Sequence, residues 1–157
     1  MGCFAEPLGD SDTLTGVPGR EECQGRRSTP REIVTEIYKA ISDGNLSRAA
    51  DAFDDGIVLV VHGPNVETGT YTGRDEVTRW FGRWFAAFAP GYEMEVEELR
   101  EFGNRVFVVQ LHHGQGRTSG VPVEMRNASL ISVRDREIRR IEIYGDVQEG
   151  LEAVRSS

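Results

Sequence analysis

Residues 53–88 constrain the fold more than any other part of this 157-residue chain. They begin with an apolar, β-branched run at residues 57–61, which is typical of a buried strand. The run ends at His62, the first histidine of the chain, and a turn containing glycine and proline follows. An amphipathic, aromatic helix comes next. We therefore predict that a buried strand opens at His62 toward an aromatic helix, where a small-molecule cavity can form.

The aromatic helix is predicted over residues 74–88, before Pro90 and Gly91 end it. Its apolar residues recur at helical spacing and form a single stripe: Val77, Trp80, Phe81, Trp84, Phe85 and Phe88. The simplest interpretation of this stripe is core packing. We also expect one or two of its rings, Trp80 and Trp84 among them, to line the mouth of a cavity.

Two helices are predicted before this segment. Thr29-Pro30-Arg31-Glu32 matches a helix start, because Thr29 can cap, Pro30 suits the first helical position and Glu32 lies at the capping-box distance. An apolar stripe then continues to Ile41, and Asp43-Gly44-Asn45 breaks the helix. A short second helix is predicted over residues 46–53.

The second half of the chain indicates strand after strand. After a short strand within residues 68–73, the alternation and β-branched content predict four more, at residues 92–97, 105–113, 121–133 and 137–144. Helices that come early and strands that come late indicate an α+β fold. We expect a curved, mostly antiparallel sheet wrapped over three helices.

Composition limits the classes of partner that this chain is expected to bind. The net charge of −8 argues against nucleic acid, because a phosphate backbone requires a basic face. No apolar run approaches the ~20 residues that span a bilayer, so no membrane partner is expected. The first residues lack the basic and apolar regions of a secretory signal, which makes a cytoplasmic location the expectation.

Residues 1–28 are predicted to be a disordered tail, and residues 29–157 a single domain. The two cysteines, Cys3 and Cys23, both fall in this tail, and their spacing matches no metal site. The three histidines show no metal-ligand spacing either. We therefore predict no metal, and nothing in the chain indicates another cofactor.

Five short motifs in a fixed order resemble the nuclear transport factor 2-like superfamily, and most closely its SnoaL-like branch. They stand at residues 43–46, 53–55, 71–77, 119–123 and 144–146, and the resemblance covers roughly residues 30–154. It implies a cone-shaped α+β barrel with an internal cavity. Isomerases, dehydratases, cyclases, epoxide hydrolases and pure binding proteins share this fold, so the fold alone does not identify the reaction.

The resemblance suggests His62 as a catalytic residue. In the related ketosteroid isomerases a carboxylate base stands at the end of this strand, and here that position holds a histidine, which titrates near neutral pH. The alternative is that His62 anchors the following turn through its ring nitrogens.

Asp146 is the second catalytic candidate. It resembles the aspartate near the end of the last strand that SnoaL-like cyclases use as an acid and base, and burial beside aromatic rings would raise its pKa. The alternative is that Asp146 caps a final helix over residues 147–154.

His112 and His113 are adjacent on one strand, so they point to opposite faces of the sheet. Comparison with limonene epoxide hydrolases implies that Leu111 and His113 face the pocket. Those enzymes carry an arginine and an aspartate at these positions and a carboxylate where this chain has Ile143, so their catalytic triad is absent. The outer face would then carry Val106, Val108, Gln110 and His112. Relatives dimerise through this face, so we expect a homodimer.

The ketosteroid isomerase site is also incomplete. Its tyrosine aligns nearer to Ile37 than to Tyr38, and its second acid corresponds to about Asn127 or Ala128. An asparagine there can still donate a hydrogen bond to an enolate oxygen. The residues expected to line the pocket are Tyr38, Trp80, Trp84, His113, Asn127 and Tyr144.

These observations lead to two hypotheses. The first is a SnoaL-like protein that binds a small hydrophobic metabolite and abstracts a proton next to a carbonyl, with His62 or Asp146 as the base. Asn127, Tyr38 or His113 would then donate to the developing oxyanion. The second is a non-catalytic ligand-binding or dimerisation module of the same fold.

Overall fold

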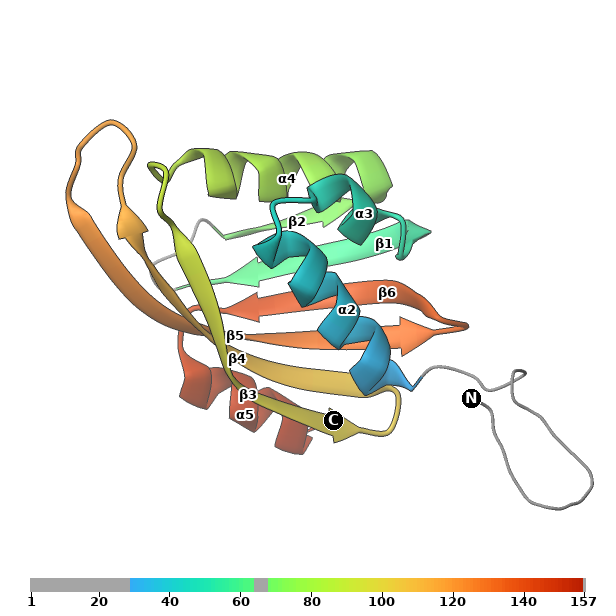
Figure 1. Ribbon diagram of the computed structural model, residues 1–157. Coiled ribbons are helices and arrows are strands. Elements are labelled where there is room, and N and C mark those ends of the chain that lie inside the picture. The colour runs from blue at the N-terminus through green and yellow to red at the C-terminus, as the bar shows by residue number, and fades with distance from the viewer. Residues whose placement is uncertain (1–28, 64–67, 157) are drawn as a thin grey trace, which may run out of the picture.

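The computed structural model describes residues 29–63 and 68–156 (Figure 1). The predicted tail, with both cysteines, lies outside the described residues. The elements are α2 (Pro30–Ser42), α3 (Leu46–Ala50), β1 (Phe53–His62), β2 (Gly69–Thr72), α4 (Arg74–Ala86), β3 (Glu93–Phe102), β4 (Arg105–Gln115), β5 (Pro122–Arg134), β6 (Glu137–Tyr144) and α5 (Val147–Ser156).

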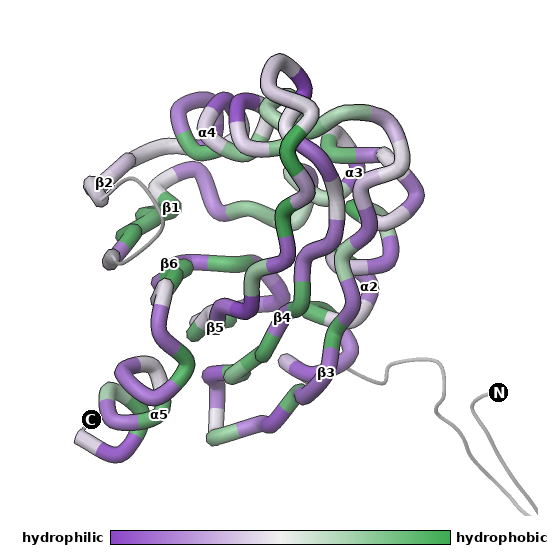
Figure 2. The backbone as a smooth tube through the Cα atoms, turned by 90° about the vertical axis from the view of Figure 1, so that its left-hand side faces the viewer, coloured by the Kyte–Doolittle hydropathy of each residue, from purple (hydrophilic) through white to green (hydrophobic). Residues whose placement is uncertain are grey.

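A single curved sheet with the strand order β2-β1-β6-β5-β4-β3 organises the molecule. Only β1 and β6 pair in parallel, and every other neighbouring pair is antiparallel. Helices α2, α3 and α4 lie on the concave side, and α5 lies on the opposite side (Figures 1 and 2). The sheet does not close on itself. The α+β class and the cone-like arrangement predicted from the sequence are confirmed.

The first helix begins as its sequence predicts. The Glu32 amide donates to Oγ1 of Thr29 over 3.2 Å, and the Thr29 amide donates to Oε1 of Glu32 over 2.9 Å, which completes the capping box. Gly44, with a φ of 77°, lies just beyond the end of the helix. Within the described part of the chain, no helix is long and apolar enough to cross a membrane.

The second helix is shorter than predicted. It ends at Ala50, because the chain becomes extended at Phe53, whose backbone pairs with Ile138 of β6. Leu46 and Ala49 therefore belong to the helix, whereas Phe53, which continues their helical spacing in the sequence, is the first inward-facing residue of β1. Strand pairing takes precedence over that local pattern.

The sheet has a packed layer on each side. On the concave side, Val34 of α2, Val77 of α4 and Ile57 of β1 belong to the main core. On the convex side, Phe107, Val109, Ala128, Leu130 and Tyr144 pack against α5. The outer face of β4 and β5 is therefore covered by the last helix of the same chain.

The side chains of β4 point to the opposite faces of the sheet from those predicted. Val106 and Val108 belong to the concave core, and Gln110 and His112 are buried with it. The physical reason is α5: it buries the outer face too, so β4 is apolar on both sides and its pattern does not show which face is inner. The homodimer through the outer face stays a prediction.

Gly150 marks the closest approach of α5 to the sheet. A Cβ at this position would lie 3.1 Å from Cε1 of Phe107, 3.3 Å from the Ala128 Cβ and 3.4 Å from Cδ2 of Tyr144. Gly82 of α4 offers a contrast, since a Cβ there would meet no atom within 4 Å.

We predict opposite effects at these two glycines. Gly150→Leu will lower the free energy of unfolding by about 1–3 kcal/mol, because the larger side chain overpacks the layer under α5. Gly82→Ala will raise it by up to ~1 kcal/mol, because alanine favours the helix. Chemical denaturation of both variants checks this, and a Gly150→Leu protein as stable as the parent would show that α5 is not seated as described.

Candidate functional site

A small cavity lies inside the cone, between the concave face of the sheet and helices α2 and α4. Its volume is about 50 Å³, which is room for one polar group or a water molecule or two. Most of its lining is apolar, including Phe53, Trp80 and Ile141. Apart from the two tryptophans, the polar side chains that line it in the described part of the chain are Tyr38, Gln110, His112, Asn127 and Ser129.

A groove of about 700 Å³ adjoins this cavity at the surface. It runs between the α2–α3 connection, α4 and the edge strand β3. Ile41, Phe85 and Met94 line both the groove and the interior cavity. The groove and the cavity therefore lie next to each other and share three lining side chains.

Three of the buried polar side chains form a closed ring. Nε2 of Gln110 donates to the Tyr38 hydroxyl over 2.5 Å and lies 3.0 Å from Oγ of Ser129. The Ser129 hydroxyl is 3.3 Å from Oε1 of Gln110 and is also in hydrogen-bond contact with Tyr38. Burial raises the pKa of Tyr38, so this phenol stays neutral. The ring satisfies its own members and needs no ligand.

The other polar side chains form an open chain. The Tyr92 hydroxyl lies 2.5 Å from Nδ1 of His112, and Nε2 of His112 lies 3.0 Å from Oδ1 of Asn127. An amide oxygen only accepts, so Nε2 carries the ring proton and the Nδ1 lone pair accepts from Tyr92. Tyr92 lines the groove and His112 lines the cavity. The chain therefore crosses from one space to the other.

Burial keeps this chain uncharged. Desolvation lowers the pKa of His112, which is 3% exposed, against a smaller opposing effect of the hydrogen bond to Asn127. Desolvation also raises the pKa of Tyr92, partly offset by a hydrogen bond with Trp84. Near neutral pH the imidazole is therefore neutral, with its one lone pair accepting from Tyr92, and the phenol keeps its proton.

Asn127 ends the chain with an unpaired donor. Its Oδ1 accepts from His112, but its Nδ2 amino group has no hydrogen-bond partner among the described residues, although the side chain is only 4% exposed. Buried amides are almost always paired. This donor faces a cavity that has room for an acceptor, either a water molecule or one polar group of a ligand.

The structure brings together only part of the predicted site. Tyr38, Trp80, Trp84 and Asn127 line the interior cavity. His113 lines the outer groove instead, and its Nδ1 lies 3.6 Å from Oε2 of Glu124. Its place in the interior is taken by His112, as the reversed facing of β4 requires.

His62 lies on the outer face of the sheet, so the prediction that it opens into the cavity is wrong. Its Nε2 is 3.2 Å from Oε1 of Glu142, and its ring stacks on Tyr144 with centroids 4.5 Å apart. The cause is the pleat: the inward residues of β1 are Ile57, Leu59 and Val61, so the next residue points outward. Tyr144 faces outward for the same reason, beneath α5.

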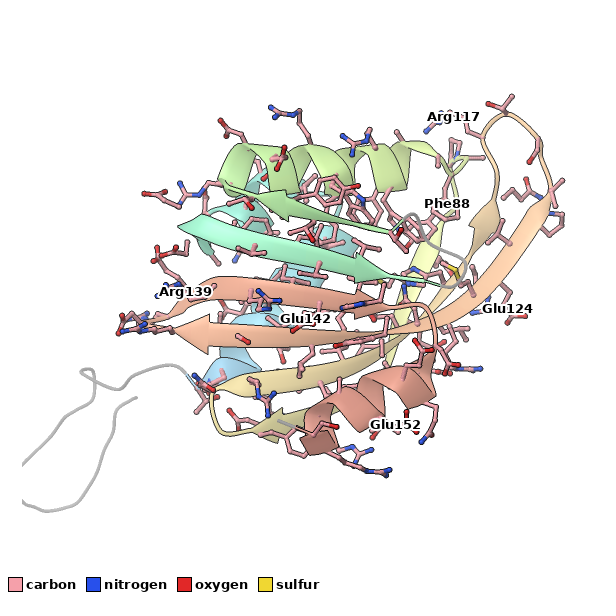
Figure 3. All side chains as sticks on the ribbon, turned by 180° about the vertical axis from the view of Figure 1, so that it is seen from behind. Phe88, Arg117, Glu124, Arg139, Glu142 and Glu152 are labelled. Carbon is pink, nitrogen blue, oxygen red and sulfur yellow. The ribbon has the colours of Figure 1, made fainter. Side chains whose placement is uncertain are left out.

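Glu142 is the centre of this outer group (Figure 3). Its two carboxylate oxygens bind His62, Tyr144 and Arg140, with Tyr144 at 3.0 Å and Arg140 at 3.1 Å. Burial works to raise the pKa of Glu142, but these hydrogen bonds outweigh it and the pKa is lowered. Burial and the neighbouring carboxylate raise the pKa of Tyr144 to about 12. The group is satisfied within itself.

Asp146 caps the last helix. Its Oδ1 accepts from the Gln148 amide over 2.8 Å, and the residue is exposed. It does not line the interior cavity. The alternative interpretation of Asp146 as a helix cap is the one that the structure shows.

The prediction from sequence missed Gln110, His112 and Ser129 in the cavity, and Tyr92 beside it. One signal could have revealed the first three. Gln110 and His112 occupy alternate positions of a strand that is otherwise apolar, and so do Asn127 and Ser129 on the next strand. Polar residues two apart on neighbouring buried strands share a face and meet in the core. In the described part of the chain, no group of three His, Cys, Asp or Glu could hold a metal.

We predict that His112 keeps its proton on Nε2 and takes up a second proton only at a lower pH than an ordinary histidine, because burial lowers its pKa. Nitrogen-15 NMR of histidine-labelled protein measures this directly. Because its folded-state pKa is the lower one, His112 contributes stability above its unfolded pKa, and that contribution is lost as the pH falls. A His112 ring that takes up its second proton at the same pH as an ordinary histidine, or at a higher one, would contradict the buried chain.

Comparison with known proteins agrees with the fold. The NTF2-like protein of Burkholderia thailandensis is 24% identical and superimposes with a TM-score of 0.69, covering 82% of this chain and 98% of its own. A hypothetical protein with a ketosteroid isomerase-like fold from Catenulispora acidiphila, solved in complex with trimethylamine, is also 24% identical. Its TM-score is 0.63, over 74% of this chain and 86% of its own.

A protein assigned as a polyketide cyclase from Xanthomonas campestris is 18% identical, with a TM-score of 0.60 over 78% of this chain and 94% of its own. A search of the curated proteins finds no match. The family model described as the SnoaL-like domain matches residues 34–141, which include β1 to β5, the first half of β6 and the buried polar side chains of the cavity. The chain therefore belongs to the SnoaL-like domain family.

Proposed function

We propose that this protein binds a small, largely apolar molecule carrying a carbonyl group, and that the buried polar chain moves a proton at the carbon next to that carbonyl. The observation that carries the proposal is the unpaired Nδ2 donor of Asn127, adjacent to a neutral histidine, in a cavity that borders a large groove. A carbonyl oxygen is an acceptor that fits this donor.

The two spaces suggest how such a ligand would be held. The interior of about 50 Å³ admits one small polar end, and the groove of about 700 Å³ admits the rest of the molecule. Met94 and Phe85 lie between the two spaces, and methionine adapts readily to a new neighbour. The ligand enters with its carbonyl first, and its apolar body stays among Ile41, Leu46 and Phe85.

The proton step uses the open chain. The proton that leaves the carbon passes to the Tyr92 oxygen, while the Tyr92 hydroxyl proton passes to Nδ1 of His112. The electron pair of the broken C–H bond moves to the carbonyl oxygen, where Nδ2 of Asn127 stabilises the negative charge. Reversal of these transfers returns the proton to the same or a neighbouring carbon, which is the chemistry of an isomerase or cyclase. The family and the polyketide cyclase-like neighbour support this class.

A non-catalytic binding protein is the second candidate. The observation that favours it is the hydrogen bond between Tyr92 and His112, because it already occupies the one lone pair of the imidazole. In that case the chain only holds the carbonyl. Proton exchange on a bound ketone distinguishes the two functions.

The binding test uses 6,6-dimethylheptan-2-one, a neutral methyl ketone whose carbonyl lies at the small end of an apolar body. We expect Asn127→Asp to weaken its binding about tenfold or more, because a carboxylate keeps the acceptor for His112 but presents no donor to the carbonyl. Asn104→Asp, the same change at an exposed turn, will leave binding unchanged. Calorimetric titration measures both. Equal affinity of the parent and Asn127→Asp proteins would contradict the assignment of Asn127.

Exchange in heavy water tests the proton step. We expect the parent protein to replace hydrogen by deuterium at the carbon next to the carbonyl, and His112→Gln to lose this exchange, as NMR of the ketone will report. Binding without exchange in the parent would favour the non-catalytic candidate. Exchange that survives in His112→Gln would exclude His112 as the base.

A further inference from the structure

Gly82 stands in the middle of α4, where glycine is unfavourable. Glycine destabilises the interior of a helix relative to alanine, so a structural reason for its presence is expected. The usual reasons are a left-handed backbone or a close neighbour. Neither applies to Gly82: its φ is not positive, and a Cβ at this position would meet no described atom within 4 Å.

Two other glycines show what such a reason looks like. Gly44, which also lines the groove, has a φ of 77° just beyond the end of α2. Gly150 lets α5 approach the sheet, because a Cβ there would lie 3.1 Å from the ring of Phe107. At Gly82 no described neighbour fills the place of a side chain. The space beside it is therefore left open by the protein.

The open space belongs to the groove. Gly82 lines the groove but not the interior cavity, whereas Phe85, which follows on the same helix, lines both. The two residues are three positions apart, which places them about 4.5 Å apart along the helix axis. A ligand that leaves the cavity beside Phe85 and continues along α4 therefore passes the bare backbone at Gly82.

Bulky apolar side chains form the other sides of the groove. Ile41 at the end of α2, Leu46 at the start of α3 and Met94 of β3 all line it. These side chains project from their elements, whereas α4 presents only backbone at Gly82. The absence of a side chain at this position therefore contributes directly to the width of the groove.

We propose that Gly82 determines specificity for the width of the ligand, and that the natural ligand is a ketone whose apolar body is branched or cyclic rather than a straight chain. This inference rests on the proposed function, in which the buried, unpaired Nδ2 donor of Asn127 holds the carbonyl end. Glycine at this position lowers the stability of α4 but keeps the groove open, which is a trade between stability and function.

The experiment compares two isomeric methyl ketones, 6,6-dimethylheptan-2-one and nonan-2-one. They share one molecular formula and one carbonyl end, and they differ in whether the apolar body ends in a tert-butyl group or continues as a straight chain. Calorimetric titration gives both affinities, and their ratio is the quantity of interest. A variant that is only less stable loses affinity for both ketones alike, so the ratio reports the width of the groove. We expect the parent protein to bind the branched ketone more tightly.

Variants of α4 locate the effect. We expect Gly82→Leu to weaken binding of the branched ketone about tenfold and to leave nonan-2-one within about twofold, because the new side chain narrows the groove. The smaller change Gly82→Ala will weaken the branched ketone about threefold, although alanine favours the helix. Ala86→Leu is the matched control, because it enlarges an exposed side chain of the same helix that does not line the groove. This control will keep the affinity ratio of the parent.

The outcomes separate this inference from the proposed function. A parent protein that prefers nonan-2-one, or an affinity ratio that stays the same in both Gly82 variants, would overturn the role of Gly82 and leave the carbonyl anchor standing. The same change of ratio in Ala86→Leu would also overturn it. Asn127→Asp that binds both ketones as the parent does would instead overturn the anchor at Asn127. Failure of both ketones to bind the parent would overturn the proposed function and this inference together.

Discussion

Desolvation of polar side chains inside the cone is the constraint on which the rest of the site depends. A hydroxyl, amide or imidazole taken from water into an apolar interior destabilises the fold unless it is hydrogen-bonded. This chain places such groups at alternate positions of β4 and β5, all on the concave face. It pairs them in two ways. The set around Tyr38 closes on itself, whereas the set around His112 leaves the donor of Asn127 open.

Desolvation also explains why the polar groups on the two faces of the sheet differ. His62, Glu142 and Tyr144 form a satisfied group on the outer side, where water still reaches the histidine, whose side chain is 40% exposed. His112 lies in a dry space and is held neutral. The two histidines differ in chemistry because the pleat sends one outward and the other inward, and a shift of one residue would exchange such faces.

Much of the architecture could be predicted from local patterns. The capping box at Thr29 and the strand bounds at Glu137 and Tyr144 appear in the structure as predicted, because caps and turns depend on near neighbours. The facing of β1 and β4 could not be predicted in this way. Both are apolar over several consecutive residues, so they carry no alternation. On β4 the outward residues Phe107 and Val109 are buried beneath α5, so burial on both sides hides which face is inner.

The candidate site likewise contains some residues that the sequence predicted and others that depend on tertiary packing. Trp80 and Trp84, expected from the helical spacing of the aromatic stripe, line the cavity, and so do Tyr38 and Asn127, which the family resemblance suggested. The sequence did not predict which histidine lines the cavity, because choosing between His112 and His113 requires knowing which face of β4 points inward. Tyr92 belongs to the connection between α4 and β3, and its contact with His112 depends on tertiary packing that no local pattern reports.

Isotope-edited infrared spectroscopy of the bound neutral ketone, labelled with carbon-13 at its carbonyl, tests the central claim most directly. A hydrogen bond lowers the stretching frequency of a carbonyl group. If Nδ2 of Asn127 donates a hydrogen bond to the ligand oxygen, the carbonyl band of the bound ketone will lie below its position in an alkane solvent, and Asn127→Asp will abolish that shift. A bound ketone whose carbonyl absorbs as it does in the alkane would contradict the account.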